Sequence, residues 1–159
     1  MKTILVFFMS FLVCSTFAAE HHASKMADQV KIDNAWARAT FALAKSGAAY
    51  MTINNISAKE LRLVSVSVSE SVANDAQLHH TIMKDDVMSM QELDDGVVVD
   101  ASSGVEFLPG GKHIMLLGLT GPLLAGESLV LTFTFEDESI LNHTFAIKDA
   151  TNAPKSMSH

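Results

Sequence analysis

The alternation that indicates the fold of this chain is plainest in Leu61–Ser69, which has the sequence LRLVSVSVS. Val64, Val66 and Val68 occupy every second position there, and serines occupy the positions between them. Successive side chains of a β-strand point to opposite faces of a sheet, so the pattern is typical of a strand with one buried face. We therefore predict a strand that buries these valines and exposes the serines.

Other segments have the same apolar and β-branched character, and no long stretch with helical periodicity follows residue 18. The further predicted strands are Val30–Ala39, Ala48–Asn54, Gln77–Met83, Val87–Leu93, Val97–Ala101, Val105–Leu108, His113–Leu117, Ser128–Phe135 and Ile140–Ile147. The turn-forming residues between them include Asn54-Asn55, Lys84–Asp86, Asp94–Gly96, Pro109–Gly111 and Glu136–Glu138. Many short strands at close spacing predict an all-β fold, a Greek-key sandwich or barrel, in one domain.

The N-terminus has the features of a secretory signal peptide over residues 1–18. Lys2 is followed by the apolar run ILVFFMSFLV at 4–13, and small residues precede a cleavage site near Ala18 or Ala19. The run is about half of what a membrane span needs, so we expect export without membrane insertion. Cys14 invites a lipoprotein interpretation, but Val13 is a poor fit to the small residue that a lipobox needs there.

Cleavage leaves a chain of about 140 residues without cysteine, a normal size for one domain. We expect flexible tails at 19–29 and 149–159 around a domain at 30–148. The whole chain has a net charge of −7, and the signal contributes only the positive Lys2, so the mature chain has −8. This acidic balance argues against binding to nucleic acid or to anionic membrane surfaces.

Two histidines and two methionines in strand-like segments are the candidate metal ligands. They are His79, Met90, His113 and Met115. Soft thioether sulfur selects Cu(I), and imidazole suits copper and several other first-row metals. Without a cysteine the mature chain cannot form a blue-copper electron-transfer site, so the set points to Cu(I) binding rather than to electron transfer.

The spacing of these residues allows them to meet. His113 and Met115 are two positions apart, on one face of a strand. In Gln77–Leu93 two strand-like halves flank Lys84–Asp86, which predicts a hairpin. A two-residue turn would pair Met83 with Asp86, Thr81 with Met88 and His79 with Met90. Met88 shares the face of Met90 and is a reserve ligand.

The same residues also have a structural interpretation. Methionine fills cores well, and a single His-x-Met on a strand is often a chance pairing. Trp36 and Tyr50 are the only residues of their kinds and are predicted to pack in the core. His80 would point away from His79, and His143 is predicted to be an ordinary half-exposed histidine.

The chain resembles the periplasmic copper-A chaperone family (PCuAC), whose motif is H-x10-M-x21-H-x-M. Ten residues separate His79 from Met90, 22 rather than 21 separate Met90 from His113, and Met115 follows in place. The extra residue falls in the turn-rich stretch 94–111, where an insertion is tolerated. Further likeness lies in NAWARA at 34–39, GAAYM at 47–51 and LPGGKHIMLLGL at 108–119, so that it covers about residues 30–148.

The resemblance implies a cupredoxin-like β-sandwich that carries Cu(I) in the periplasm. It also implies that His79, Met90, His113 and Met115 are the ligands, and that the acceptor is the copper-A subunit of cytochrome c oxidase or one of its assembly factors. Two other functions remain: a copper storage or resistance protein without a dedicated acceptor, and a structural or adhesive β-sandwich whose histidines and methionines are incidental. Catalysis is not expected, since the chain has neither a G-x-S-x-G elbow nor an H-E-x-x-H motif.

The mature N-terminus suggests a second copper site. Cleavage after Ala18 makes His21 the third residue, and cleavage after Ala19 does the same for His22. A free amine, two backbone amides and a third-position imidazole form a square-planar nitrogen set that suits Cu(II). The alternative is a tail with histidines of no function.

Overall fold

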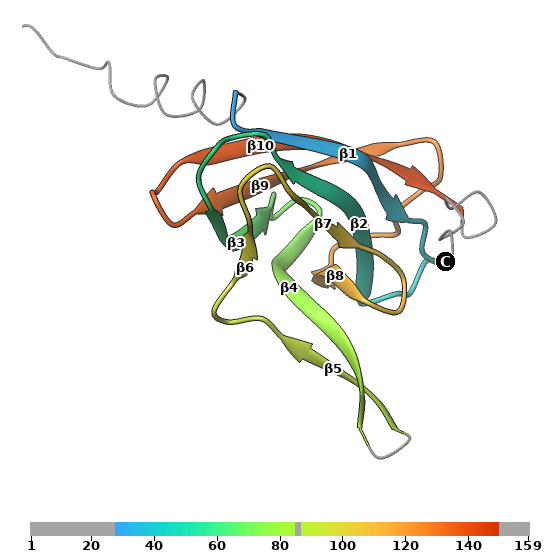
Figure 1. Cartoon of the computed structure of the whole chain (residues 1–159). Helices are drawn as coiled ribbons and strands as arrows, with labels where there is room; N and C mark the ends of the chain where they lie inside the picture. The colour runs from blue at the N-terminus through green and yellow to red at the C-terminus, as the bar shows by residue number, and fades with distance from the viewer. Residues whose placement is uncertain (1–27, 85–86, 150–159) are drawn as a thin grey trace, which may run out of the picture.

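Every regular element in the computed structural model, which describes residues 28–84 and 87–149, is a β-strand (Figure 1). The strands are β1 (Val30–Arg38), β2 (Ser46–Asn55), β3 (Leu61–Val68), β4 (Ala73–Lys84), β5 (Val87–Glu92), β6 (Val97–Val99), β7 (Gly104–Phe107), β8 (Lys112–Leu119), β9 (Ser128–Phe135) and β10 (Ile140–Lys148). Each predicted strand is present, with ends that differ by a few residues. Within the described ranges, no helix is long and apolar enough to cross a membrane.

Several predictions concern residues outside the described ranges. They are the signal peptide at 1–18 and its cleavage near Ala18 or Ala19, Cys14, the N-terminal copper site at His21 and His22, and most of the two tails. These stay predictions.

The strands form one strongly curved sheet. Their order is β5-β4-β8-β2-β1-β10-β9-β3-β6, and β7 pairs with β2 beyond the end of β8. Only the β1–β10 pair is parallel among the described strands. Because β3, near one end of this order, packs against β4, near the other, the sheet closes over a single core. The result is the predicted all-β, cupredoxin-like sandwich.

The core lies between the two halves of the sheet. Phe133 of β9 and Phe145 of β10 come from one half, with ring centroids 6.1 Å apart. Ile114 of β8 and Met51 of β2 come from the other half, and all four side chains are buried. Burying a side chain of this size contributes about 1.5–3 kcal/mol, so this layer holds the strands in place without disulfides.

The valine alternation in β3 holds only in part. Val66 is buried and Val68 packs against the core, as predicted, but the register shifts between Leu63 and Ser65. Leu63 pairs with Phe135 and Ser65 with Thr134, so two residues of β3 match one of β9. This β-bulge reverses the alternation. Leu63 is therefore buried in the core, and Val64 is only half-buried.

The turn predicted at Asn54-Asn55 is wrong, because both residues belong to β2. The Asn55 side chain is buried and donates to the carbonyl oxygens of Lys59 at 2.7 Å and Val99 at 2.9 Å. Its own oxygen accepts from the backbone N–H of Ser57 at 3.0 Å. The Asn55 side chain thus holds the loop that follows β2 against β6. A solvent-exposed turn residue would not make these contacts.

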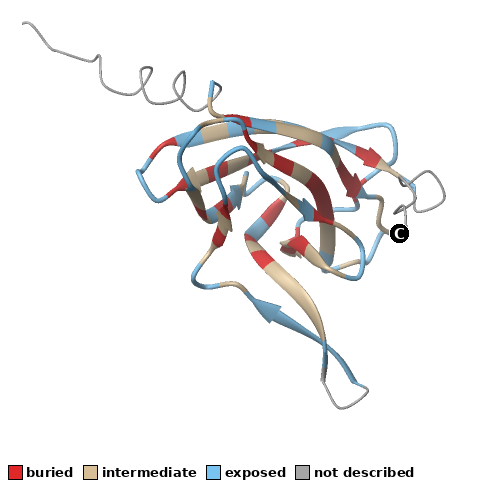
Figure 2. Ribbon diagram, viewed as in Figure 1, coloured by how far each residue is buried: buried red, intermediate tan, exposed pale blue. Residues whose placement is uncertain are grey.

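The hairpin of β4 and β5 projects from the sandwich (Figure 1). β4 pairs with β8 as far as His80 and Lys112, and the Thr81 N–H donates to the Gly111 carbonyl oxygen at 3.0 Å. Beyond Thr81, the described part of β4 pairs with β5 alone. All six residues of β5 are exposed, as the pale blue colour in Figure 2 shows. The outer half of the hairpin is therefore a two-stranded arm in contact with solvent.

Candidate metal centre

β8 places His113 and Met115 on the sheet face that points away from the core. The residues between and after them, Ile114 and Leu116, are fully buried in the core, and Met115 is half-buried on the other face. His113 is 5% exposed and its Nδ1 lies 3.1 Å from the carbonyl oxygen of Gly111. A carbonyl can only accept, so Nδ1 donates and Nε2 keeps a free lone pair. His113 is oriented as a metal ligand would be.

His79 of β4 lies directly opposite His113 of β8. The centroids of the two rings are 5.8 Å apart, with the ring planes inclined at 46°. The Nε2 atom of His79 is 3.0 Å from the side-chain oxygen of Gln77. Its Nδ1 atom is buried and has no hydrogen-bond partner among the described residues. A buried ring nitrogen without a partner is costly in a native structure, and a bound ion would supply what is missing.

Met90 reaches this face by a different register from the predicted one. The observed pairs are His79 with Glu92, Thr81 with Met90, Met83 with Met88 and Lys84 with Val87. The predicted direct pairing of His79 with Met90 is therefore wrong. The connection starts one residue later on each strand, which displaces every pair by two positions. A shift of two keeps the face of each side chain, so Met90 is a diagonal neighbour of His79.

Three of the four predicted ligands line one pocket. Met90, His113 and Met115 contribute to its wall, and its volume is about 610 Å³. Other parts of the wall come from Arg38 and from residues 39–48. His79 does not line this pocket but adjoins it through the ring of His113. The structure thus gathers imidazole nitrogen and thioether sulfur from three neighbouring strands, β5, β4 and β8.

Tyr50 completes one side of this pocket. Its ring lies 4.7 Å from that of Trp36 between centroids, and both side chains are buried, as predicted. Burial raises the pKa of the Tyr50 phenol, while the nearby Arg38 guanidinium acts in the opposite direction. Tyr50 therefore stays a neutral phenol at physiological pH. From the sequence, Tyr50 was predicted only to pack in the core, but it also lines the pocket of the candidate centre.

Three residues near the histidines were not identified from the sequence. The Gln77 side-chain oxygen accepts from Nε2 of His79, the Gly111 carbonyl orients His113, and Glu92 lies directly opposite His79. Gln77 and Gly111 each precede a predicted ligand by two positions. Residues two apart on a strand share a face, so this spacing could have identified both as neighbours of the ligands. Glu92 could be found only from the correct hairpin register.

The remaining described histidines differ from these two. His80 pairs with Lys112 and with Gln91, on the face opposite to His79, as predicted. His143 is half-buried, with its ring edge toward Phe145 at 5.8 Å between centroids. Desolvation lowers the pKa of His143, and the Asp33 carboxylate partly offsets this.

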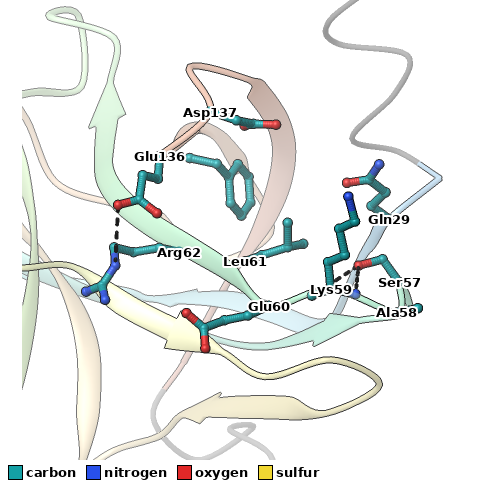
Figure 3. Close-up of a pocket in the computed structure, with 10 residues that line it drawn as sticks. Gln29, Ser57, Ala58, Lys59, Glu60, Leu61, Arg62, Glu136 and Asp137 are labelled. Atoms are coloured by element: carbon teal, nitrogen blue, oxygen red, sulfur yellow. Dashed lines mark hydrogen bonds and ion pairs between the residues drawn. The ribbon is translucent and has the colours of Figure 1, made fainter.

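A second pocket lies where β3 begins and β9 ends (Figure 3). Its wall carries charged and polar side chains, and Arg62 Nε is 3.9 Å from a Glu136 carboxylate oxygen. None of its lining residues is histidine or methionine. It is therefore not a candidate for a soft metal ion.

Comparison with known proteins agrees with this architecture. A protein family described as "LpqE-like: Putative lipoprotein LpqE-like" matches residues 30–147. The "Putative lipoprotein Lxx21020" of Leifsonia xyli subsp. xyli is 35% identical over 138 residues, which cover 86% of this chain and 80% of that protein.

Two solved structures are similar in fold. The first is the "Copper-bound PCuAC domain from PmoF2", with a TM-score of 0.61 and 22% identity over 76% of this chain and 93% of that one. The second is the solution structure of "CuI-DR1885" from Deinococcus radiodurans, with a TM-score of 0.53 and 24% identity over 83% and 87%. Because the family match covers residues 30–147 and the Leifsonia xyli protein is 35% identical, this chain belongs to the LpqE-like family, which is the PCuAC family.

Proposed function

We propose that this protein is an exported Cu(I) carrier whose ligands are His79, Met90, His113 and Met115. The observation that carries the proposal is the direct opposition of His79 and His113, with two thioethers on the same sheet face. Two similar structures, of PmoF2 and DR1885, are of copper-bound forms, and the second is of the Cu(I) form. No catalytic turnover is part of this function.

The ligand set explains why the ion would be Cu(I) and why it could be released. Thioether sulfur favours the soft monovalent ion, and two imidazoles complete a trigonal or tetrahedral set. All four ligands are neutral when they bind, so no buried ion pair has to be broken when copper leaves. Met90 is 60% exposed, which leaves one side of the centre open to an incoming ligand of another protein. These features suit transfer by ligand exchange.

The test is an anaerobic Cu(I) titration of the mature protein against a chromophoric competing chelator. We expect one tightly bound Cu(I), and an affinity at least about tenfold lower in His113→Ala and Met115→Leu, since even outer-shell changes cost about 10–100-fold. Leucine keeps the volume of Met115 and removes only the sulfur. His80→Ala is the matched control, because His80 points to the other face. Equal affinity in His113→Ala and His80→Ala would refute the ligand assignment.

We further propose that the protein works in the periplasm and supplies the copper-A centre of cytochrome c oxidase. The family membership and the predicted signal peptide support this. The experiment mixes the Cu(I)-loaded protein with the soluble copper-A domain of an oxidase subunit and follows the ion in each separated partner. Movement of copper to that domain is expected. Retention by the carrier would favour the alternative, a storage or resistance protein without a dedicated acceptor.

A second copper site at the mature N-terminus is a separate proposal. His21 or His22, as third residue, would hold Cu(II) together with the terminal amine and two amides. Cu(II) titration of the mature chain should show a visible absorption band typical of a square-planar nitrogen site, and deletion of residues 19–22 should abolish it. An unchanged band after the deletion would disprove this site.

A further inference from the structure

One face of the β4–β5 arm carries three methionines side by side. Met83 lies directly opposite Met88, and Met90 is two positions further along β5 on the same face. Directly opposed residues have Cβ atoms about 4.5–5.5 Å apart, within reach of one another for side chains as long as methionine. The next pair toward the sandwich is Thr81 with Met90, and then come His79 and Glu92. The three methionines therefore lie on one face of the arm, between its tip and the histidines.

Core packing does not account for these methionines. Met83, Met88 and Met90 are 68%, 64% and 60% exposed, and none of them belongs to the core. The hairpin has no other strand beside it at this level, since β4 leaves β8 after His80. Apolar side chains gathered on a solvated two-stranded arm do not stabilise the fold, so their presence requires another reason.

Coordination chemistry supplies that reason. Three thioethers without a thiolate or carboxylate form a soft, neutral donor set, which selects Cu(I) over the divalent ions. Three flexible side chains on a projecting arm can close around an ion from solvent or from a donor protein. Met90 also belongs to the proposed site with His79, His113 and Met115, so it can contact the ion in both positions.

We infer that Met83, Met88 and Met90 form a second Cu(I) site, which captures the ion and passes it along the arm to the histidine site. The capture site stands on the hairpin geometry alone, and the transfer step rests on the proposed function. During transfer Met83 and Met88 leave the ion while His79, His113 and Met115 bind it, and Met90 stays attached. Copper remains Cu(I), and no proton moves because thioethers carry none and the His113 Nε2 lone pair is already free.

The test uses the mature protein with ¹³C-labelled methionine methyl groups, titrated anaerobically with Cu(I). The first equivalent should shift the methyl signals of Met90 and Met115. A second equivalent should bind more weakly, because Met90 already holds the first ion, and should shift the signals of Met83 and Met88. In a Met83→Leu, Met88→Leu variant the first equivalent should bind with unchanged affinity. Uptake of Cu(I) from a chelator complex should be slower by at least about threefold. Val87→Ala is the matched control, since Val87 is 64% exposed, like Met88, but lies on the opposite face.

A His79→Ala, His113→Ala variant separates this proposal from the proposed function. It should lose the tightly bound first equivalent and keep the Cu(I)-induced shifts of Met83 and Met88. Unshifted Met83 and Met88 signals, or an uptake rate that equals the rate of the control variant, would overturn the capture site. Unchanged tight binding in the double histidine variant would instead contradict the proposed function.

Discussion

Single polar contacts set the orientation of the residues in the candidate centre. The Gly111 carbonyl accepts from Nδ1 of His113, and the Gln77 side chain lies at Nε2 of His79. Each contact occupies one ring nitrogen and leaves the other for an ion. Partners of this kind orient the ligands of metal sites and raise their basicity. The centre is thus prepared by residues that do not touch the metal.

Asn55 gives a prediction about stability at the scale of one residue. Its side chain donates to the Val99 carbonyl oxygen in a buried hydrogen bond and accepts from the backbone N–H of Ser57, and Asn55→Ala removes both contacts. We expect the free energy of unfolding to fall by about 1–3 kcal/mol, measured by urea denaturation. Asn142→Ala, which removes an exposed hydrogen bond from Thr132, should change it by less than about 0.5 kcal/mol. Equal effects of the two variants would contradict the structural role of Asn55.

The two-residue period of the strands governs function at the scale of the element. Because Met90 and Gln91 point to opposite faces of β5, exchanging them moves the thioether away from His79 without changing composition. We expect the Met90→Gln, Gln91→Met variant to bind Cu(I) at least about tenfold more weakly than the natural protein. The chelator competition assay measures this.

The control for the Met90–Gln91 exchange is the Val87→Ser, Ser89→Val variant. Both residues lie on the face that carries no proposed ligand, and the exchange keeps them on that face. This variant should bind Cu(I) as the natural protein does. If the Met90–Gln91 exchange also bound normally, the role of strand periodicity in this site would be disproved.

The whole molecule should become more stable when copper binds. The proposed ligands lie on three strands, β4, β5 and β8, and an ion that binds only the folded state stabilises it by mass action. At a free Cu(I) concentration of about 100 times the Kd, the gain is about 2.7 kcal/mol. Anaerobic thermal unfolding followed by circular dichroism should show a higher Tm with Cu(I). His113→Ala should show no increase, and a Tm increase equal to that of the natural protein would contradict this coupling.

The all-β fold and the positions of its strands follow from the sequence because strand periodicity is local. Alternation in β3, and the placement of His113 and Met115 two residues apart on β8, can be recognised without distant contacts. The same holds for the choice of candidate ligands, since softness is a property of the side chain. The family resemblance, confirmed by the match over residues 30–147, points to the same four residues.

Other features depend on pairing between strands, which a single stretch of sequence does not encode. The hairpin register, and with it the Met83–Met88 pair, depends on where the turn of β4 and β5 closes. The bulge in β3 depends on its fit to β9, and the burial of Asn55 depends on β6. The opposition of His79 and His113 arises because β4 and β8 become neighbours in the closed sheet. Local residue patterns thus determined the strands and the chemistry of the metal donors. Pairing between distant strands decided which donors meet, because only the folded sheet fixes the distances between residues far apart in the chain.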